Sequence, residues 1–163
     1  MLKGLRQHIQ QRVARLYHPF IPSCRTMTLG ERALAQSIFG DGLALDQVQL
    51  CSSHLILRHY AMSPNGSVYF HPADFVTDFS LTSLHTQAWL VHELTHVWQV
   101  QQGIKVLRRA LLNRRYRYVL QEGKAFLEYG VEQQAQMVQD WFLKQAQGLP
   151  CADLQACIPF TIR

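Results

Sequence analysis

A chain of 163 residues with 48% hydrophobic and 17% charged residues has the composition and the length of one folded domain. This composition argues against a disordered protein, and no apolar run approaches the roughly 20 residues that span a membrane. The net charge is +5, no acidic residue precedes Glu31, and a second basic cluster lies between Lys105 and Lys124. An anionic partner would explain both clusters. We favour a solvated connector, because no nucleic-acid-binding module accompanies the charge and nucleic acid is therefore not the expected partner.

The start of the chain is basic, but the apolar core of a signal peptide does not follow it. We therefore expect synthesis in the cytoplasm without a signal peptide. The four cysteines lack Cys-x-x-Cys spacing, which argues against a zinc ribbon and against a dense disulfide framework. They are Cys24, Cys51, Cys151 and Cys157. Free thiols are the expectation, with a bridge between the last two as the alternative in an oxidising compartment.

The sequence divides into three parts. Residues 1–22 are predicted to be a basic amphipathic helix, over 2–17, and an extended linker, because apolar residues recur there at helical spacing before a Pro-containing stretch. That helix is expected to pack on the domain, with docking on a membrane or a partner as the alternative. Residues 23–148 form the main domain, and residues 149–163 are interpreted as a C-terminal tail.

The main domain begins with a capping box, Thr28-Leu29-Gly30-Glu31, which predicts a helix that ends at Gly40. Short strands are expected around residues 48–50, 55–57 and 67–71, with a turn at Ser63-Pro64-Asn65-Gly66 between the last two. A strand beside the motif described next is expected to line a substrate cleft. Four further histidines are interpreted as surface or hydrogen-bonded residues, not ligands. They are His54, His59, His71 and His85.

The most informative stretch is Val91 to Gln99, which contains His-Glu-x-x-His. On a helix, residues i and i+4 share a face, so His92 and His96 would present two imidazoles to one Zn²⁺ ion. Glu93 lies one step round the helix and is expected to take a proton from a water on that ion. The alternative is a pair of core histidines that are hydrogen-bonded to their neighbours.

The flanks of this motif, from Leu84 to Gln102, are apolar on nearly all sides and predict a buried central helix. Thr82 or Ser83 can cap its start, and Gly103 follows its end. The longer metzincin pattern would place Gly at position 99 and His at position 102, where this chain has glutamine, so that class is excluded.

A catalytic zinc site needs a third protein ligand. A long helix is predicted from Lys124 to Gln147, with Leu127, Val131, Val138 and Phe142 as its buried stripe. Glu132 borders this stripe and is the best candidate for the third ligand, while Glu122 and Glu128 are its competitors. Tyr116, Tyr118 and Tyr129 are candidates for stabilising a developing oxyanion.

At these residues the chain resembles the small bacterial His-Glu-x-x-His proteins encoded beside type VI secretion spike and Rhs genes, which are called Vgr-related zinc metallopeptidases. The matching segments are Thr28 to Gly40, Met62 to Gly66, Val91 to Gln99 and Tyr129 to Phe142. The chain is more distantly similar to gluzincins, in which a Glu-x-x-x-Asp helix supplies the third ligand and a supporting carboxylate. That match implies Glu132 as the ligand and places Gln136 where the aspartate would be.

We therefore expect a mostly helical α+β fold, a minimal gluzincin-like zincin domain with a small sheet beside the active-site helix. The function expected from these residues is that of a zinc-dependent metallopeptidase acting on protein or on peptidoglycan-linked peptide. The resemblance implies a type VI secretion-associated effector or accessory peptidase with a spike or Rhs partner, exported by that route. The alternative is a metal-stabilised adaptor or chaperone for a spike protein, without catalysis. A basic nucleic-acid binder would instead show steep salt dependence of binding.

Overall fold

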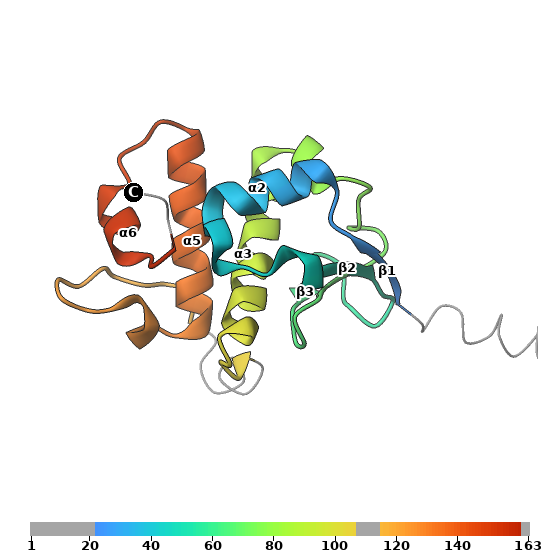
Figure 1. Ribbon diagram of the computed structural model, residues 1–163, viewed down its shortest axis with the longest axis horizontal. Helices are drawn as coiled ribbons and strands as arrows, with labels where there is room; N and C mark the ends of the chain where they lie inside the picture. The colour runs from blue at the N-terminus through green and yellow to red at the C-terminus, as the bar shows by residue number, and fades with distance from the viewer. Residues whose placement is uncertain (1–21, 107–114, 161–163) are drawn as a thin grey trace, which may run out of the picture.

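Figure 1 shows a computed structural model of the chain, which describes residues 22–106 and 115–160. The helix expected over residues 2–17 lies outside these ranges. The expected α+β class is confirmed, with a small mixed sheet and a larger share of helix. The elements are β1 (Ser23–Thr26), α2 (Leu29–Phe39), η2 (Gly40–Gly42), η3 (Leu45–Gln47), β2 (Gln49–Ser52), β3 (Ala61–Met62), β4 (Val68–Phe70), η4 (Phe79–Leu81), α3 (Leu84–Gln101), η5 (Phe126–Glu128), α5 (Val131–Ala146) and α6 (Ala152–Cys157).

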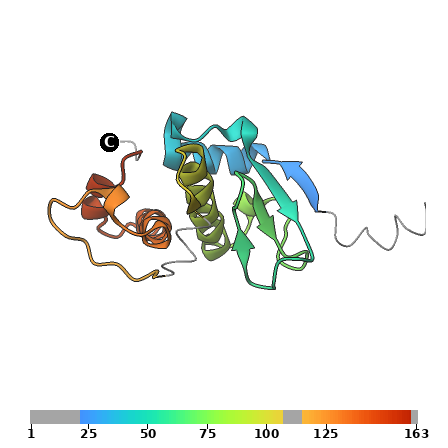
Figure 2. The ribbon, with the colours of Figure 1, turned by 90° about the horizontal axis from the view of Figure 1, so that it is seen from below.

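Helix α3 is the centre of the molecule. Figure 2 shows the sheet on one side of α3 and helices α5 and α6 on the other. Every residue from Leu90 to Gln99 is buried, as the apolar flanks of the motif predict. Ser83 caps the helix by accepting a hydrogen bond from the backbone N–H of Thr86, and Gly103, with a φ of 76°, turns the chain at the other end. Within the described ranges, no helix is both long enough and apolar enough to span a bilayer.

The four strands form a mixed sheet in the order β1-β2-β4-β3. β2 runs parallel to β4, whereas the β1–β2 and β4–β3 pairs are antiparallel. The register places Cys24 opposite Cys51, and the two form a disulfide. The expectation of free thiols was therefore wrong for this pair, because strand register brings together cysteines 27 residues apart in the sequence. Cys151 and Cys157 are free.

Two predicted elements were wrong. The strand expected at residues 55–57 is a turn-rich connection, and the short strand is β3, five residues further on. The helix expected to begin at Lys124 begins at Val131, because Gly130 is extended and its N–H donates to the Gln133 side chain, 3.0 Å away. Leu127, which was expected in the buried stripe, is therefore exposed. Within the segment interpreted as a tail, α6 and the residue after it contribute buried Leu154 and Ile158 to the core.

The side chain of Glu31 joins the start of α2 to β1 and to η4. It closes the predicted capping box with Thr28, whose backbone N–H donates to the Glu31 carboxylate at 2.8 Å. The fully buried carboxylate also accepts two hydrogen bonds of 2.7 Å from Arg25 and one of 2.8 Å from the backbone N–H of Phe79. Gly30 allows the start of α2 to lie close to η4, because a Cβ at Gly30 would overlap the Ser80 Oγ atom. These contacts fix the sheet relative to the segment that leads into α3.

Replacing Glu31 with glutamine should lower the free energy of unfolding by about 3–5 kcal/mol, measured by chemical denaturation. The change leaves Arg25 without its counter-charge and turns an amide N–H₂ toward groups that are themselves donors. The matched control is Arg32→Ala, which removes the exposed ion pair with Asp46 and should cost less than about 1 kcal/mol. Equal losses for the two variants would contradict the role given to Glu31.

Candidate metal centre

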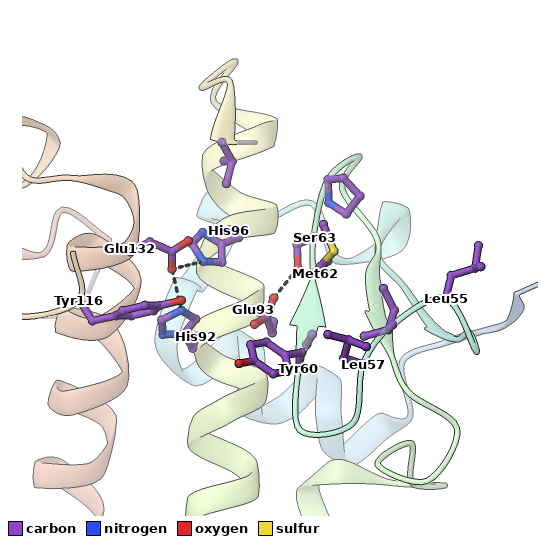
Figure 3. Close-up of a pocket in the computed structure, with 14 residues that line it drawn as sticks. Leu55, Leu57, Tyr60, Met62, Ser63, His92, Glu93, His96, Tyr116 and Glu132 are labelled. Carbon is purple, nitrogen blue, oxygen red and sulfur yellow. Dashed lines mark hydrogen bonds and ion pairs between the residues drawn. The ribbon is translucent and has the colours of Figure 1, made fainter. Parts of the chain in front are cut away.

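Helix α3 presents both motif histidines to one side. The rings of His92 and His96 lie on successive turns with their centroids 5.0 Å apart, and both are buried. Glu132, in the first turn of α5, faces them across the helix interface (Figure 3). Its Oε2 lies 3.4 Å from His92 Nε2 and 3.2 Å from His96 Nε2. The structure therefore brings together the three residues that the sequence predicts as metal ligands, with their ligand atoms within 4.8 Å of one another.

A buried glutamine holds α5 in this register. Gln99, one turn after His96, is fully buried and donates through Nε2 to the backbone carbonyl of Val131 at 3.0 Å and to Gln134 Oε1 at 2.9 Å. Gln134 donates in turn to the backbone carbonyl of Tyr129 at 2.7 Å. Because a buried amide is costly unless its hydrogen bonds are made, this network fixes the first turn of α5 against α3.

The same network determines the tautomer of a neutral His96. A backbone carbonyl can only accept, so the Gln99 atom that faces Val131 must be the amide nitrogen. The Gln99 oxygen therefore faces His96 Nδ1, at 2.9 Å, and Nδ1 must donate the proton. The other nitrogen, Nε2, is left with a lone pair that points at the Glu132 carboxylate. Two acceptors that face each other require a cation between them, either a proton or a metal ion.

The electrostatics of the cluster point the same way. Burial acts to lower the pKa of His96, but the hydrogen bond to Glu132 and the charges of Glu93 and Glu132 outweigh it and raise the pKa. Burial also acts to raise the pKa of Glu132, but the two histidines, which donate hydrogen bonds to it when they are protonated, hold this pKa well below its usual range. His92 Nδ1 is buried without a hydrogen-bond partner in the described structure. Two imidazoles and a carboxylate with excess negative charge fit a divalent cation such as Zn²⁺.

Glu93 lies beside the cluster but takes no part in it. Its Oε2 accepts a hydrogen bond of 2.9 Å from the hydroxyl of Ser63, and both side chains are buried (Figure 3). Ser63 directly follows β3, so the sheet reaches the motif helix through this contact. The sequence marks Ser63 as the first residue of a turn and as part of the matching segment Met62 to Gly66, but neither pattern indicates a contact with Glu93.

The cluster and Glu93 line a pocket of about 470 Å³. Tyr116 lies in its wall, with its ring centroid 6.0 Å from that of His92. Two of the other polar residues predicted at the site, Tyr129 and Gln136, do not line the pocket. The Tyr129 hydroxyl accepts from the backbone N–H of Gln121 and donates to the carbonyl of Val119, and Gln136 donates to Asp140 at 2.8 Å.

The competing ligands are also used elsewhere. Glu128 is exposed and accepts a hydrogen bond from the backbone N–H of Ala125, while Glu122 is exposed. Asp140 accepts from Tyr118, the third tyrosine that we had considered for the oxyanion. Of the spare histidines, His54, His59 and His85 are exposed, and His71 Nδ1 accepts from the backbone of Ala73. None of these residues joins the three-residue cluster.

No family model matches the sequence. Comparisons with curated proteins and with solved structures both find VgrG2b. The chain is 38% identical over 133 residues to the type VI secretion system spike protein VgrG2b of Pseudomonas aeruginosa. The match covers 74% of this chain but only 13% of VgrG2b. Among solved structures, the effector domain of VgrG2b matches with a TM-score of 0.71 and 36% identity, covering 85% of this chain and 84% of that domain.

Glu132→Ala should reduce zinc affinity by at least about 10–100-fold, measured by competition with a chromogenic chelator, because it removes one of three converging ligand atoms. Glu128→Ala, four residues earlier, should leave the affinity unchanged. A strong loss in the Glu128 variant, with Glu132→Ala retaining zinc, would show that the ligand set is wrong.

Gln99→Leu should lower zinc affinity by about 10–100-fold, because His96 loses the acceptor that holds its proton on Nδ1. The variant also loses contacts to α5, so its folding is checked by circular dichroism. The control is Gln102→Leu, at an exposed position of the same helix end, which should bind zinc as tightly as the unaltered chain. Unchanged affinity in a folded Gln99→Leu variant would contradict the tautomer argument.

Proposed function

This chain belongs to the family of the VgrG2b effector domain, and on that premise we propose that it is a type VI secretion-associated effector that hydrolyses peptide bonds with zinc as its cofactor. The observation that carries the proposal is the convergence of His92, His96 and Glu132 on one point, with the Glu93 carboxylate buried beside it. A pocket large enough for part of a peptide opens onto the same residues.

The three residues suit a zinc ion because of the types of ligand atom that they provide. Two neutral imidazoles and one carboxylate are a ligand set found in catalytic zinc sites, and they leave a coordination position open. When bound there, Zn²⁺ would supply Lewis-acid polarisation of the scissile carbonyl and would lower the pKa of a coordinated water. His92, His96 and Glu132 would hold the ion, and Gln99 keeps the His96 Nε2 lone pair directed at it.

Glu93 is the proposed general base. Ser63 holds one oxygen of its carboxylate, which leaves the other to take a proton from the attacking water. The water oxygen bonds to the carbonyl carbon, the carbon–nitrogen bond breaks, and Glu93 passes its proton to the departing amine. Tyr116, in the pocket wall beside His92, is the candidate donor to the carbonyl oxygen as negative charge develops.

The disulfide between Cys24 and Cys51 supports an effector that works outside the cytoplasm. Cytoplasmic proteins keep their thiols reduced, whereas disulfides persist in the periplasm and beyond the cell. We propose a secretion-spike protein as the partner that carries the chain there. This proposal rests on the relative VgrG2b, which is itself a type VI secretion system spike protein, although the matched region is only 13% of it.

One observation favours the alternative, a metal-stabilised adaptor for a spike protein. His92 Nδ1 has no hydrogen-bond partner among the described residues, and Gln136, at the position where gluzincins carry a supporting aspartate, is turned to Asp140. A ligand histidine without that support binds metal less firmly and in a less defined orientation. An adaptor would need the metal but not the carboxylate of Glu93.

The peptidase and the adaptor differ in whether they need the Glu93 carboxylate, so a substitution of Glu93 distinguishes them. Glu93→Gln should keep its zinc and its fold but cleave peptides about 10²–10⁴-fold more slowly, because the amide cannot accept the proton. Cleavage is measured by mass spectrometry of a proteome-derived peptide mixture, and bound zinc by elemental analysis. If Glu93→Gln cleaves as fast as the unaltered chain, the mechanism is wrong. If the zinc-loaded unaltered chain cleaves nothing, the adaptor is the better account.

A further inference from the structure

The connection between β2 and β3 forms one wall of the pocket and leaves large apolar side chains open to solvent. Leu55, Leu57 and Tyr60 are 68%, 72% and 62% exposed, and Met62 in β3 is 42% exposed. All four line the pocket. Figure 3 shows Leu57 and Met62 on the Ser63 side of Glu93, across from Glu132, with the Tyr60 ring below Glu93. Single exposed apolar residues are ordinary, but a group of them beside a pocket marks a binding surface.

The side chains of this wall that line the pocket carry no charge, and Arg58 and His59 of the same connection are not among them. Among the described lining residues, the carboxylates and imidazoles are those of Glu93 and the candidate metal cluster, to which the proposed mechanism assigns proton transfer and metal binding. A charged side chain that entered along the wall would lose its hydration without gaining a partner, whereas an apolar one would bury surface. The wall therefore discriminates by hydrophobicity.

The sheet edge beside the pocket suits an extended chain. β3 pairs with β4 on one side, and within residues 22–106 and 115–160 no strand pairs with its other side. Ala61 and Met62 of β3 both line the pocket. An extended polypeptide can pair its backbone with such an edge while alternate side chains reach the neighbouring surface. The edge and the apolar wall thus present complementary features to one segment of protein.

We propose that the site takes an extended segment of a protein and selects a bulky apolar side chain next to the scissile bond, and that the stem peptide of peptidoglycan is not its substrate. Stem peptides are built largely from alanine and from residues that carry free carboxylates. They would leave the apolar wall unfilled and bring charges against it. This inference rests on the proposed peptidase function and narrows its substrate class.

Cleavage-site profiling tests the proposal directly. The zinc-loaded full chain is incubated with a proteome-derived peptide mixture and, separately, with purified muropeptides. We expect Leu, Ile, Met or Phe to be enriched about tenfold or more at one position flanking the cleaved bonds. Muropeptides should remain intact. Cleavage without apolar enrichment, or faster cleavage of muropeptides, would overturn the substrate class while leaving the peptidase function in place.

A variant pair shows whether the 55–62 wall is responsible. Leu57→Asp should reduce the apolar enrichment several-fold and admit Lys or Arg at the same position, because it places a carboxylate in the wall. Leu81→Asp is the matched control, since Leu81 is 84% exposed and lies outside the pocket. It should leave the profile unchanged. The same apolar preference in both variants would show that the wall does not select the substrate.

Binding to a non-cleaving variant separates the substrate class from catalysis. Zinc-loaded Glu93→Gln is titrated with fluorescent decapeptides that differ only at one central residue, which is Leu, Phe, Ala, Asp or Lys. We expect the Leu and Phe peptides to bind at least about fivefold more tightly than the others, within the range that one apolar contact provides. This result would support binding of an extended segment through an apolar side chain even if the unaltered chain cleaves nothing. Equal binding of all five peptides, or no binding, would overturn it.

Discussion

The buried amide of Gln99 is the contact on which the arrangement of the candidate metal centre depends. It ties the motif helix to the first turn of α5 through the Val131 carbonyl and the Gln134 side chain, and it leaves its oxygen for His96. A shift of α5 by one turn, about 5.4 Å, would break the two hydrogen bonds from Gln99 to α5 and carry Glu132 away from the histidines. Because fully buried polar groups are costly when unpaired, that shift is strongly disfavoured.

The opposite side of α3 is fixed by a different buried polar group. Glu31 holds β1, the start of α2 and η4 together, and the Cys24–Cys51 disulfide joins β1 to β2. The sheet built on these contacts carries β3 to the pocket, and Ser63 at its end holds the Glu93 carboxylate. The residues proposed to bind the metal and the residue proposed to move protons are therefore positioned independently, from the two faces of one helix.

The proposed chemistry follows from charge as much as from geometry. With His96 neutral and its proton on Nδ1, the His96 Nε2 lone pair and the Glu132 carboxylate face each other as two acceptors. Protons and a divalent cation must then compete for the same lone pairs, so metal affinity should fall as the pH drops through the raised pKa of His96. Among the described residues, His92 Nδ1 has no hydrogen-bond partner, so this imidazole lacks the second contact that would orient it toward a metal ion.

The sequence alone determined whatever depends on near neighbours in the chain. The capping box at Thr28 to Glu31, the buried helix around His92 and His96, and the turn at Gly103 all follow from spacings of three to seven residues, and local hydrogen bonding enforces them. Glu132 could be preferred over Glu128 only on the edge of a predicted stripe and on a family resemblance. Tertiary structure decided the rest. The chain from Lys124 to Gly130 is not α-helical, Tyr129 turns its hydroxyl to the backbone, Cys24 meets Cys51, and Ser63 reaches Glu93. Each of these outcomes joins residues that lie far apart in the sequence or overrides a local helical pattern, and strand register and helix packing are set by the whole core.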